Sequence, residues 1–252
     1  MSDWWNELND LWKDLFAINY VYQYRCSDSM REDIITLGTN PFEGYKMTTG
    51  QEFARFDVSD KMLEQMLDLE FFYASSCSLD NVLPLVGLKN IRKLDLYVND
   101  IRDLSCISDF ENLREVYIEK NFIKSINFLE KSSHLKELFA RHNLLEDVEV
   151  LAQHKHLTFV DISINGLSDI SCLKGAKQLK QLQCAGNNLE SLSFLAGHPE
   201  IEALECASNN IKDASFLFYL PKLEYADISD NPIEYDKYDW DKLIDNGVEV
   251  DR

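Results

Sequence analysis

Apolar residues recur along most of this chain at a fixed interval of 22 residues, as from Leu69 to Ile91. Counting from Leu69, the first position of the unit is apolar in eight consecutive copies, with no insertion or deletion between them. These first positions are Leu69, Ile91, Leu113, Leu135, Leu157, Leu179, Ile201 and Leu223. A fixed period of this length is typical of repeat architectures, in which each unit packs only against its neighbours and the stack shares one core.

The positions inside one unit predict its local structure. Positions 4 and 6 are apolar, as in Leu94 and Leu96, and a spacing of two predicts a short strand with one buried face. Positions 11, 14 and 17 are apolar at spacings of three, which favours a 3₁₀ or irregular return segment over a long α-helix. Position 9 is Cys77 in the first unit and then Asn99, Asn121, Asn143, Asn165, Asn187, Asn209 and Asn231. An asparagine amide can both donate and accept, so this column can satisfy backbone groups buried at a turn.

This pattern resembles the leucine-rich repeat family, in particular the short 22-residue class of bacterial internalin-like proteins and of a phosphatase-regulatory subunit. The resemblance covers residues 69–235. The sequence departs from it at Cys77 and at position 20, which is usually apolar but holds Ser132, His154, Ala176 and His198. The resemblance implies an α/β solenoid: a leucine-rich repeat horseshoe with parallel strands on the concave face, a 3₁₀ or irregular convex side, a helical N-terminal cap and a short helical C-terminal cap.

Residues 1–68 do not follow the repeat. Apolar residues at spacings of three and four predict an amphipathic helix over residues 3–22, whose aromatic face includes Trp4 and Trp5. This face either shields the open end of the solenoid or docks another protein. Residues 26–57 are predicted to be connecting loop with one short strand, and the spacing of their glycines does not fit a phosphate loop. Residues 59–67 predict a short helix with a Ser or Asp cap.

Residues 236–252 predict a C-terminal cap. A helix is expected over residues 236–245, and Gly247 is a typical stop signal. Val248 and Val250 fall at positions 4 and 6 if the same period continues into a ninth unit. We therefore expect a ninth strand, with the helix covering the edge that would otherwise invite aggregation.

Candidate binding residues lie in the columns that the repeat does not dictate. Positions 3, 5 and 7 should point outward from the strands, onto the concave surface. These columns combine aromatic rings with carboxylates, which favours binding of Lys or Arg side chains through cation–π contacts and salt bridges. The alternative is that the rings only stabilise the sheet by stacking on one another. The candidate partner-binding residues are Phe71, Tyr73, Asp95, Tyr97, Glu115, Tyr117, Glu119, Glu137, Phe139, Arg141, Phe159, Asp161, Tyr225 and Asp227.

The charge of the chain restricts its partners. It carries 44 acidic and 25 basic residues, for a formal net charge of −19. Nucleic acids and anionic membranes should therefore be repelled and a basic protein attracted, and the sequence shows no obvious basic patch that would reverse this locally. The N-terminal segment up to Tyr20 has neither a basic start nor a continuous apolar run, so we expect no signal peptide or membrane span and a cytoplasmic location.

The sequence gives little support for catalysis, a metal or a cofactor. Cys184 and Cys206 occupy position 6 of adjacent repeats, where a disulfide is conceivable but reduced core side chains are expected. His154 and His198 at position 20 are interpreted as half-buried packing residues, and His142 lies at position 8 beside a strand. His154 and His156 have no Cys or carboxylate at a metal-ligand spacing. A glycosidase-like carboxylate pair is not favoured either, because facing carboxylates are expected by chance on so acidic a surface.

Three functional hypotheses follow from these observations. We favour a bacterial protein-binding module that occludes or organises a basic partner, within that class an immunity or inhibitor protein covering a cognate toxin or enzyme. The first alternative is a regulatory scaffold subunit for another enzyme. The second is an adhesin-like surface protein. The step from fold to function rests on chemistry and analogy.

Overall fold

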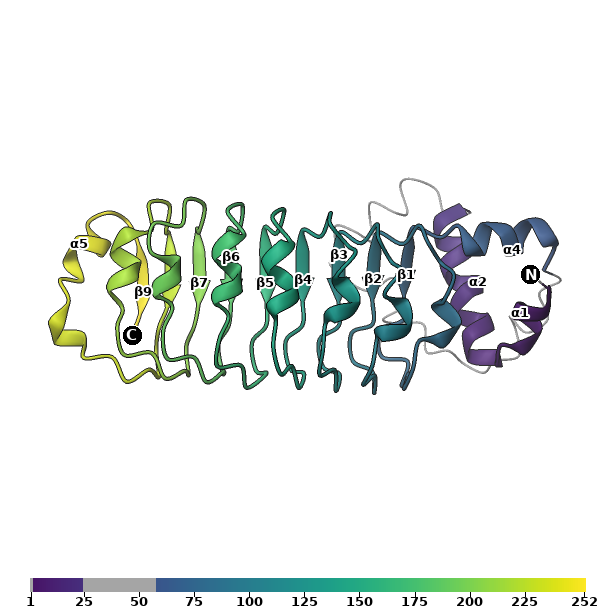
Figure 1. The fold of residues 1–252 in the computed structure, drawn as a ribbon, viewed down its shortest axis with the longest axis horizontal. Helices are drawn as coiled ribbons and strands as arrows, with labels where there is room; N and C mark the ends of the chain where they lie inside the picture. Colours follow the sequence, from purple (N-terminus) through teal and green to yellow (C-terminus); the bar gives the residue numbers. More distant parts are fainter. Residues whose placement is uncertain (1, 25–57) are drawn as a thin grey trace.

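The computed structural model describes residues 2–24 and 58–252, and it shows a single row of stacked repeats (Figure 1). One sheet of nine parallel strands runs through the row in the order of the sequence. The strands are β1 (Phe71–Tyr73), β2 (Lys93–Asp95), β3 (Glu115–Tyr117), β4 (Glu137–Phe139), β5 (Phe159–Asp161), β6 (Gln181–Gln183), β7 (Ala203–Glu205), β8 (Tyr225–Asp227) and β9 (Glu249–Asp251). The predicted leucine-rich repeat solenoid is confirmed.

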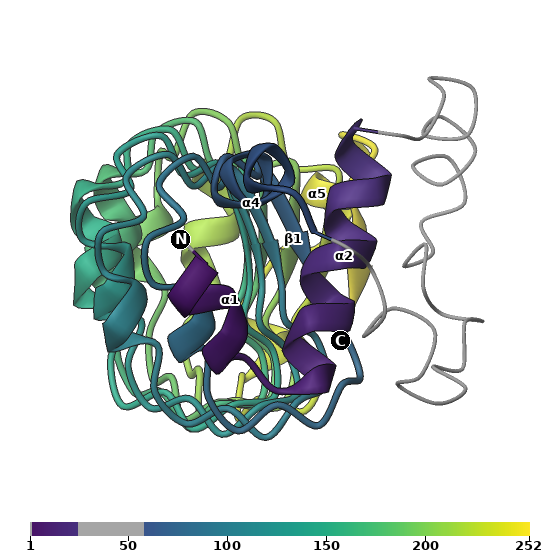
Figure 2. The same cartoon turned by 90° about the vertical axis from the view of Figure 1, so that its right-hand side faces the viewer.

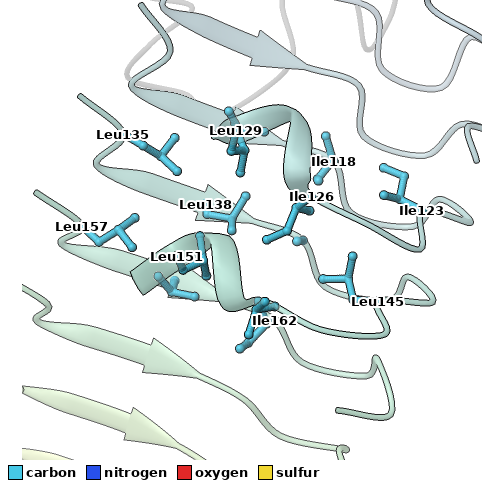
Figure 3. Packing of buried hydrophobic residues seen from close by; sticks show 14 of the residues in the cluster. Ile118, Ile123, Ile126, Leu129, Leu135, Leu138, Leu145, Leu151, Leu157 and Ile162 are labelled. Carbon is cyan, nitrogen blue, oxygen red and sulfur yellow. The ribbon is translucent and has the colours of Figure 1, made fainter. Parts of the chain in front are cut away.

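The strands pair in the register that the sequence period predicts. Phe72 lies opposite Leu94 and Leu94 opposite Val116, and the same offset continues to β8. The position-4 residues of the eight repeats are all fully buried. The sheet backs onto a continuous core to which successive repeats contribute equivalent side chains, as Leu135 and Leu157 do (Figure 3).

Each repeat returns through a 3₁₀ helix, as the spacing of three predicts. These helices are η1 (Leu83–Leu85), η2 (Ser105–Ile107), η3 (Asn127–Leu129), η4 (Glu149–Gln153), η5 (Ser171–Gly175), η6 (Ser193–Leu195), η7 (Ser215–Tyr219) and η8 (Tyr235–Lys237). They form the side opposite the sheet (Figure 2).

The asparagine column ties each repeat to the one before it. The Nδ2 of Asn121 donates to the carbonyl oxygens of Leu96 and Ile118, and its Oδ1 accepts from the amide of Ile101. The same bonds recur at Asn99, Asn143, Asn187 and Asn209, which are all buried. This column therefore fixes both the turn after each strand and the distance between repeats.

The N-terminal helix differs from the prediction. Two helices, α1 (Ser2–Glu7) and α2 (Asp10–Tyr24), replace the single helix expected over residues 3–22. The break arises at Asn9, whose side chain accepts from the amide of Trp12 and so begins a new helix. Trp4 stacks edge-on against Phe16, and both pack on the core, in accord with the capping interpretation rather than free docking rings. The loop and strand predicted for residues 26–57 lie outside the described residues, as do the glycines weighed there against a phosphate loop.

Helix α2 hydrogen-bonds to the open edge of the sheet. Asn19 donates through Nδ2 to the carbonyl of Tyr73 and accepts at Oδ1 from the amide of the same residue. One turn further on, Gln23 accepts from the amide of Glu70. The side chains of α2 thus replace a neighbouring strand, which protects the edge from pairing with another chain. The short helix predicted over residues 59–67 is α4 (Asp60–Leu67), with Ser59 as its N-cap.

Replacing Asn19 with alanine is expected to lower the free energy of unfolding by about 2 kcal/mol, because the amide and carbonyl of Tyr73 lose their partner beneath the helix. Urea unfolding followed by circular dichroism measures this loss. Asn6→Ala, at an exposed position of α1, is the matched control and should change stability little. Equal stability of the two variants would show that α2 does not hold the edge.

The C-terminal strand departs from the predicted register. Val250 of β9 lies opposite Ala226, so the last interval is longer than the others and Val250, not Val248, takes position 4. The helix α5 (Asp241–Ile244) is shorter than expected. The segment before α5 forms an aromatic cluster instead, in which the ring of Trp240 packs against those of Tyr235 and Tyr238.

Candidate functional site

The candidate site is the outward-facing side of the sheet, called here the sheet face and made by positions 3, 5 and 7. In β2, β3 and β4 the central residue is buried and its two neighbours are half-exposed, as alternation along a strand requires. Positions 3 and 5 of these three repeats are therefore accessible.

Three aromatic rings from adjacent strands stack on the sheet face. The ring centroids of Tyr117 and Phe139 are 4.4 Å apart with planes 8° apart, and those of Phe139 and Phe159 are 4.4 Å apart at 25°. We call these three residues the ring stack. All three remain partly exposed, so stacking and availability to a partner are compatible.

Two lysines of the chain itself already contact rings on this face. The Nζ of Lys93 lies 4.7 Å from the ring centroid of Tyr117 and 2.9 Å from the Oε2 of Glu115. The Nζ of Lys120 lies 5.2 Å from the ring centroid of Tyr97 and donates to its hydroxyl. Sequence reasoning missed both contacts, although Lys93 occupies position 3 and could have been read from its column.

A carboxylate cluster lies beside the ring stack. Glu119 is half-buried, and its Oε2 has no hydrogen-bond partner among the described residues. Burial raises the pKa of Glu119 to about 7, and the nearby charges of Asp95 and Asp161 contribute to this rise. Burial and the charge of Glu115 also raise the pKa of Glu137. The central face therefore concentrates negative charge that its own cations only partly offset.

The carboxylates at the two ends of this cluster are held in place by hydrogen bonds. Asp95 accepts from the hydroxyl of Ser75 and from the amide of Tyr97. Asp161 is only 6% exposed and accepts from the amide of Ser163. Little of the surface of Asp161 is therefore accessible, and it contributes to the sheet face mainly through its charge.

The remaining candidate residues separate into two end groups. Tyr73 is only 9% exposed, because its ring packs edge-on against Tyr22 of α2, so the structure removes it from the exposed face. Phe71 on the same strand is half-buried. At the other end the hydroxyl of Tyr225 donates to Asp251 of β9, and the Oδ1 of Asp227 accepts from the amide of Ser229. The structure thus brings together only the candidates on β2 to β5 and in the turns after them.

The cysteines and histidines have structural surroundings. Cys184 and Cys206 are free thiols, fully buried, and burial raises the pKa of both. The Nε2 of His154 donates to the carbonyl of Leu129, and His198 does the same to Ala176, so both link adjacent repeats. Both are more deeply buried than predicted, and burial lowers their pKa. Within residues 2–24 and 58–252, no group of three or more His, Cys, Asp or Glu side chains could hold a metal ion.

Comparison with known proteins identifies the fold. No family model matches the sequence, and no curated protein matches it. Among solved structures, an internalin from Listeria monocytogenes superposes with a TM-score of 0.68 at 23% identity, covering 77% of this chain and 56% of its own. The chain thus spans little more than half the length of that internalin. Internalin C2 from the same organism gives a TM-score of 0.66 at 25% identity, covering 74% of this chain and 81% of its own.

A third similar structure comes from a plant. It is the peptide hormone receptor RGFR1 in complex with RGF2, with a TM-score of 0.55 at 23% identity, covering 61% of this chain and 26% of the receptor.

In the part of the chain that the structure describes, no helix has both the length and the apolar character needed to cross a membrane. Nine parallel strands, the constant repeat register and these neighbours together show that the chain has the leucine-rich repeat solenoid fold seen in the internalins.

Proposed function

We propose that this protein is a binding module that engages a basic protein through the central sheet face. The observation that carries the proposal is the ring stack lying among carboxylates. The hydroxyl of Tyr117 donates to Glu115, and burial together with the charges of Glu115 and Glu137 raises the pKa of Tyr117. Rings supply anchoring area and cation–π contact, and carboxylates supply charge complementarity.

The lysines of the face illustrate the contact expected from a partner. Lys93 lies over a ring and against a carboxylate at once, which is the arrangement proposed for a guest Lys or Arg. No lysine or arginine lies over the rings of Phe139 or Phe159 among the described residues, so the far end of the ring stack is open to such a guest. A cation near Glu119 would also offset the cost of keeping that carboxylate charged.

The dimensions of the sheet favour a protein or peptide over a small metabolite. Eight strand intervals of about 4.8 Å give a face about 38 Å long. A surface of this length suits a protein interface of ordinary size. The plant receptor offers a parallel, because it is a peptide hormone receptor whose structure is in complex with RGF2.

Within this class we favour an immunity or inhibitor protein of a bacterial cytoplasm, because a rigid acidic face is well suited to masking a cationic cleft. The runner-up is a regulatory scaffold that holds another enzyme, which the same face would serve. The adhesin-like alternative draws on the likeness to the internalins. A neighbouring gene for a basic toxin would favour the first, and one for a phosphatase or kinase the second.

The proposal is tested by removing two rings together. Tyr117→Ala with Phe139→Ala should weaken binding of a fluorescein-labelled peptide of about eight arginines by about tenfold in fluorescence anisotropy. The matched control is Leu83→Ala with Tyr219→Ala, two exposed apolar residues on the 3₁₀ side, which should bind within about twofold of the wild type.

The same pair of variants tests a natural partner. In a pull-down from the native cell at low and high salt, a basic protein held by the wild type and by the control should be absent from the ring variant. Circular dichroism establishes that the variants fold. Retention of the peptide and of every partner by the ring variant would contradict the proposal and move the site away from the sheet face.

A further inference from the structure

Basic residues form a row at one rim of the sheet, just before the strands. Position 2 of each repeat donates its amide to the carbonyl of position 2 in the preceding repeat: Arg114 to Arg92 at 2.7 Å, Lys136 to Arg114 at 2.8 Å, and Thr158 to Lys136 at 2.8 Å. Side chains at these positions are therefore held one strand spacing apart, about 4.8 Å. Sequence reasoning saw no basic patch, because the patch exists only when this column is stacked.

The two ends of the row are neutralised and its middle is not. Arg92 pairs with Glu70 at 3.1 Å, and Lys180 pairs with Glu202 at 2.8 Å. Arg114 and Lys136, between them, are exposed and form no ion pair with any described residue.

The turns just before the next strands extend this positive surface. Lys155 and Lys177, at position 21, are exposed and likewise have no acidic partner in the described ranges. His134 and His156, at position 22 of two adjacent repeats, stack on one another with ring centroids 6.5 Å apart. We call Arg114, Lys136, Lys155 and Lys177 the cationic ridge.

The cationic ridge contrasts with several paired lysines of the repeats. Lys124 pairs with Glu146, Lys131 with Asp109 and Lys222 with Glu200, each with an acid one repeat away. Like charges on adjacent strands are destabilising. Four cations without such pairing, on a chain of net charge −19, point to a ligand that supplies the missing negative charge.

We propose that the cationic ridge binds an acidic protein segment, a short run of Asp and Glu side chains. The ridge spans three intervals of about 4.8 Å, or about 14 Å, which matches a few residues of extended chain. A nucleic acid is disfavoured, because Glu115 and Glu137 line the adjacent column of the sheet and a long phosphate backbone would meet them. Because this acidic column lies beside the cationic ridge, a partner that carries both positive and negative charge could bind in only one orientation.

The test is the binding of a fluorescein-labelled peptide of about ten glutamates, measured by anisotropy at low salt. Arg114→Glu with Lys136→Glu should weaken binding by about tenfold or more. Lys212→Glu with Lys242→Glu makes the same change in net charge at two exposed lysines elsewhere, and should stay within about twofold of the wild type. If the double reversal fails to fold, Arg114→Gln with Lys136→Gln replaces it with the same expected loss.

Three results would overturn the inference: no peptide binding by the wild type, equal weakening in the ridge and control variants, or tighter binding of a single-stranded DNA of equal charge. The ridge does not depend on the proposed function of the sheet face. A variant lacking the rings of Tyr117 and Phe139 should therefore bind the glutamate peptide as the wild type does, so the two proposals fail separately.

Discussion

Replacing Glu119 with glutamine is expected to raise the free energy of unfolding by about 3 kcal/mol at pH 8 and to change it little at pH 4. The carboxyl of Glu119 is shielded by the folded protein, which raises its pKa from 4.5 to about 7. The folded chain thus holds this proton more tightly than the unfolded chain. Stability from this group is therefore present below pH 4.5 and is lost as pH rises through about 7.

Glutamine has the shape of a protonated carboxyl and never ionises, so the variant should escape this loss. The measurement is urea unfolding of both proteins at pH 4, 6 and 8, with Glu111→Gln as a control at an exposed carboxyl. Parallel pH dependence of the wild type and Glu119→Gln would show that no costly charge is carried at Glu119.

A carboxylate that destabilises its own fold at neutral pH is informative about function. Carboxyl groups with strongly raised pKa values occur preferentially at functional sites. The raised pKa of Glu119 thus connects this residue with the proposed binding of a basic partner. A gain in stability accompanied by weaker binding of the arginine peptide would be the pattern of a functional residue.

The repeats could be predicted from the sequence because their contacts are local. Each unit packs on the next with the same register, so the buried column through Leu94 and Val116 and the bonds of Asn121 follow from the period alone. The ends could not be predicted in the same way. There the chain has no neighbour on one side, and the break at Asn9 and the shifted register of Val250 depend on contacts that occur once.

The candidate site was predicted in part. Alternation placed Tyr117, Phe139 and Phe159 on one face, and the structure brings these rings together. Alternation could not reveal that α2 covers Tyr73, because residues 54 positions apart in the sequence make the contact. Nor could alternation reveal the burial of Glu119, which depends on the three-dimensional packing around one oxygen.

The first repeat shows why the asparagine column exists. Every asparagine reaches back to a carbonyl of the preceding repeat, as Asn99 does to Ala74. Repeat one has no predecessor, and there Cys77 stands in place of asparagine, with its thiol directed at the carbonyl of Ser75. The side chain is therefore selected by the junction between repeats and not by the turn alone.

Replacing Asn143 with alanine is accordingly expected to lower the free energy of unfolding by about 3 kcal/mol. The Nδ2 of Asn143 donates to the carbonyls of Ile118 and Ala140, and its Oδ1 accepts from the amide of Ile123. Alanine leaves the amide of Ile123 unpaired in a buried junction, which costs about 1 to 3 kcal/mol. The carbonyls of Ile118 and Ala140 each lose one of two donors and keep the amides of Asn121 and Asn165, so each of these losses is smaller.

Urea unfolding with circular dichroism measures the effect, and the transition should also broaden, because a weakened central junction uncouples the two halves of a stack held only by nearest-neighbour contacts. Two controls separate the junction from asparagine chemistry in general. Asn112→Ala removes one exposed hydrogen bond to the carbonyl of Lys89, and Cys77→Ala alters position 9 where no junction exists. Each should cost less than about 1 kcal/mol. A loss at Asn143 no larger than at Cys77 would mean that the column shapes turns and does not hold neighbouring repeats together.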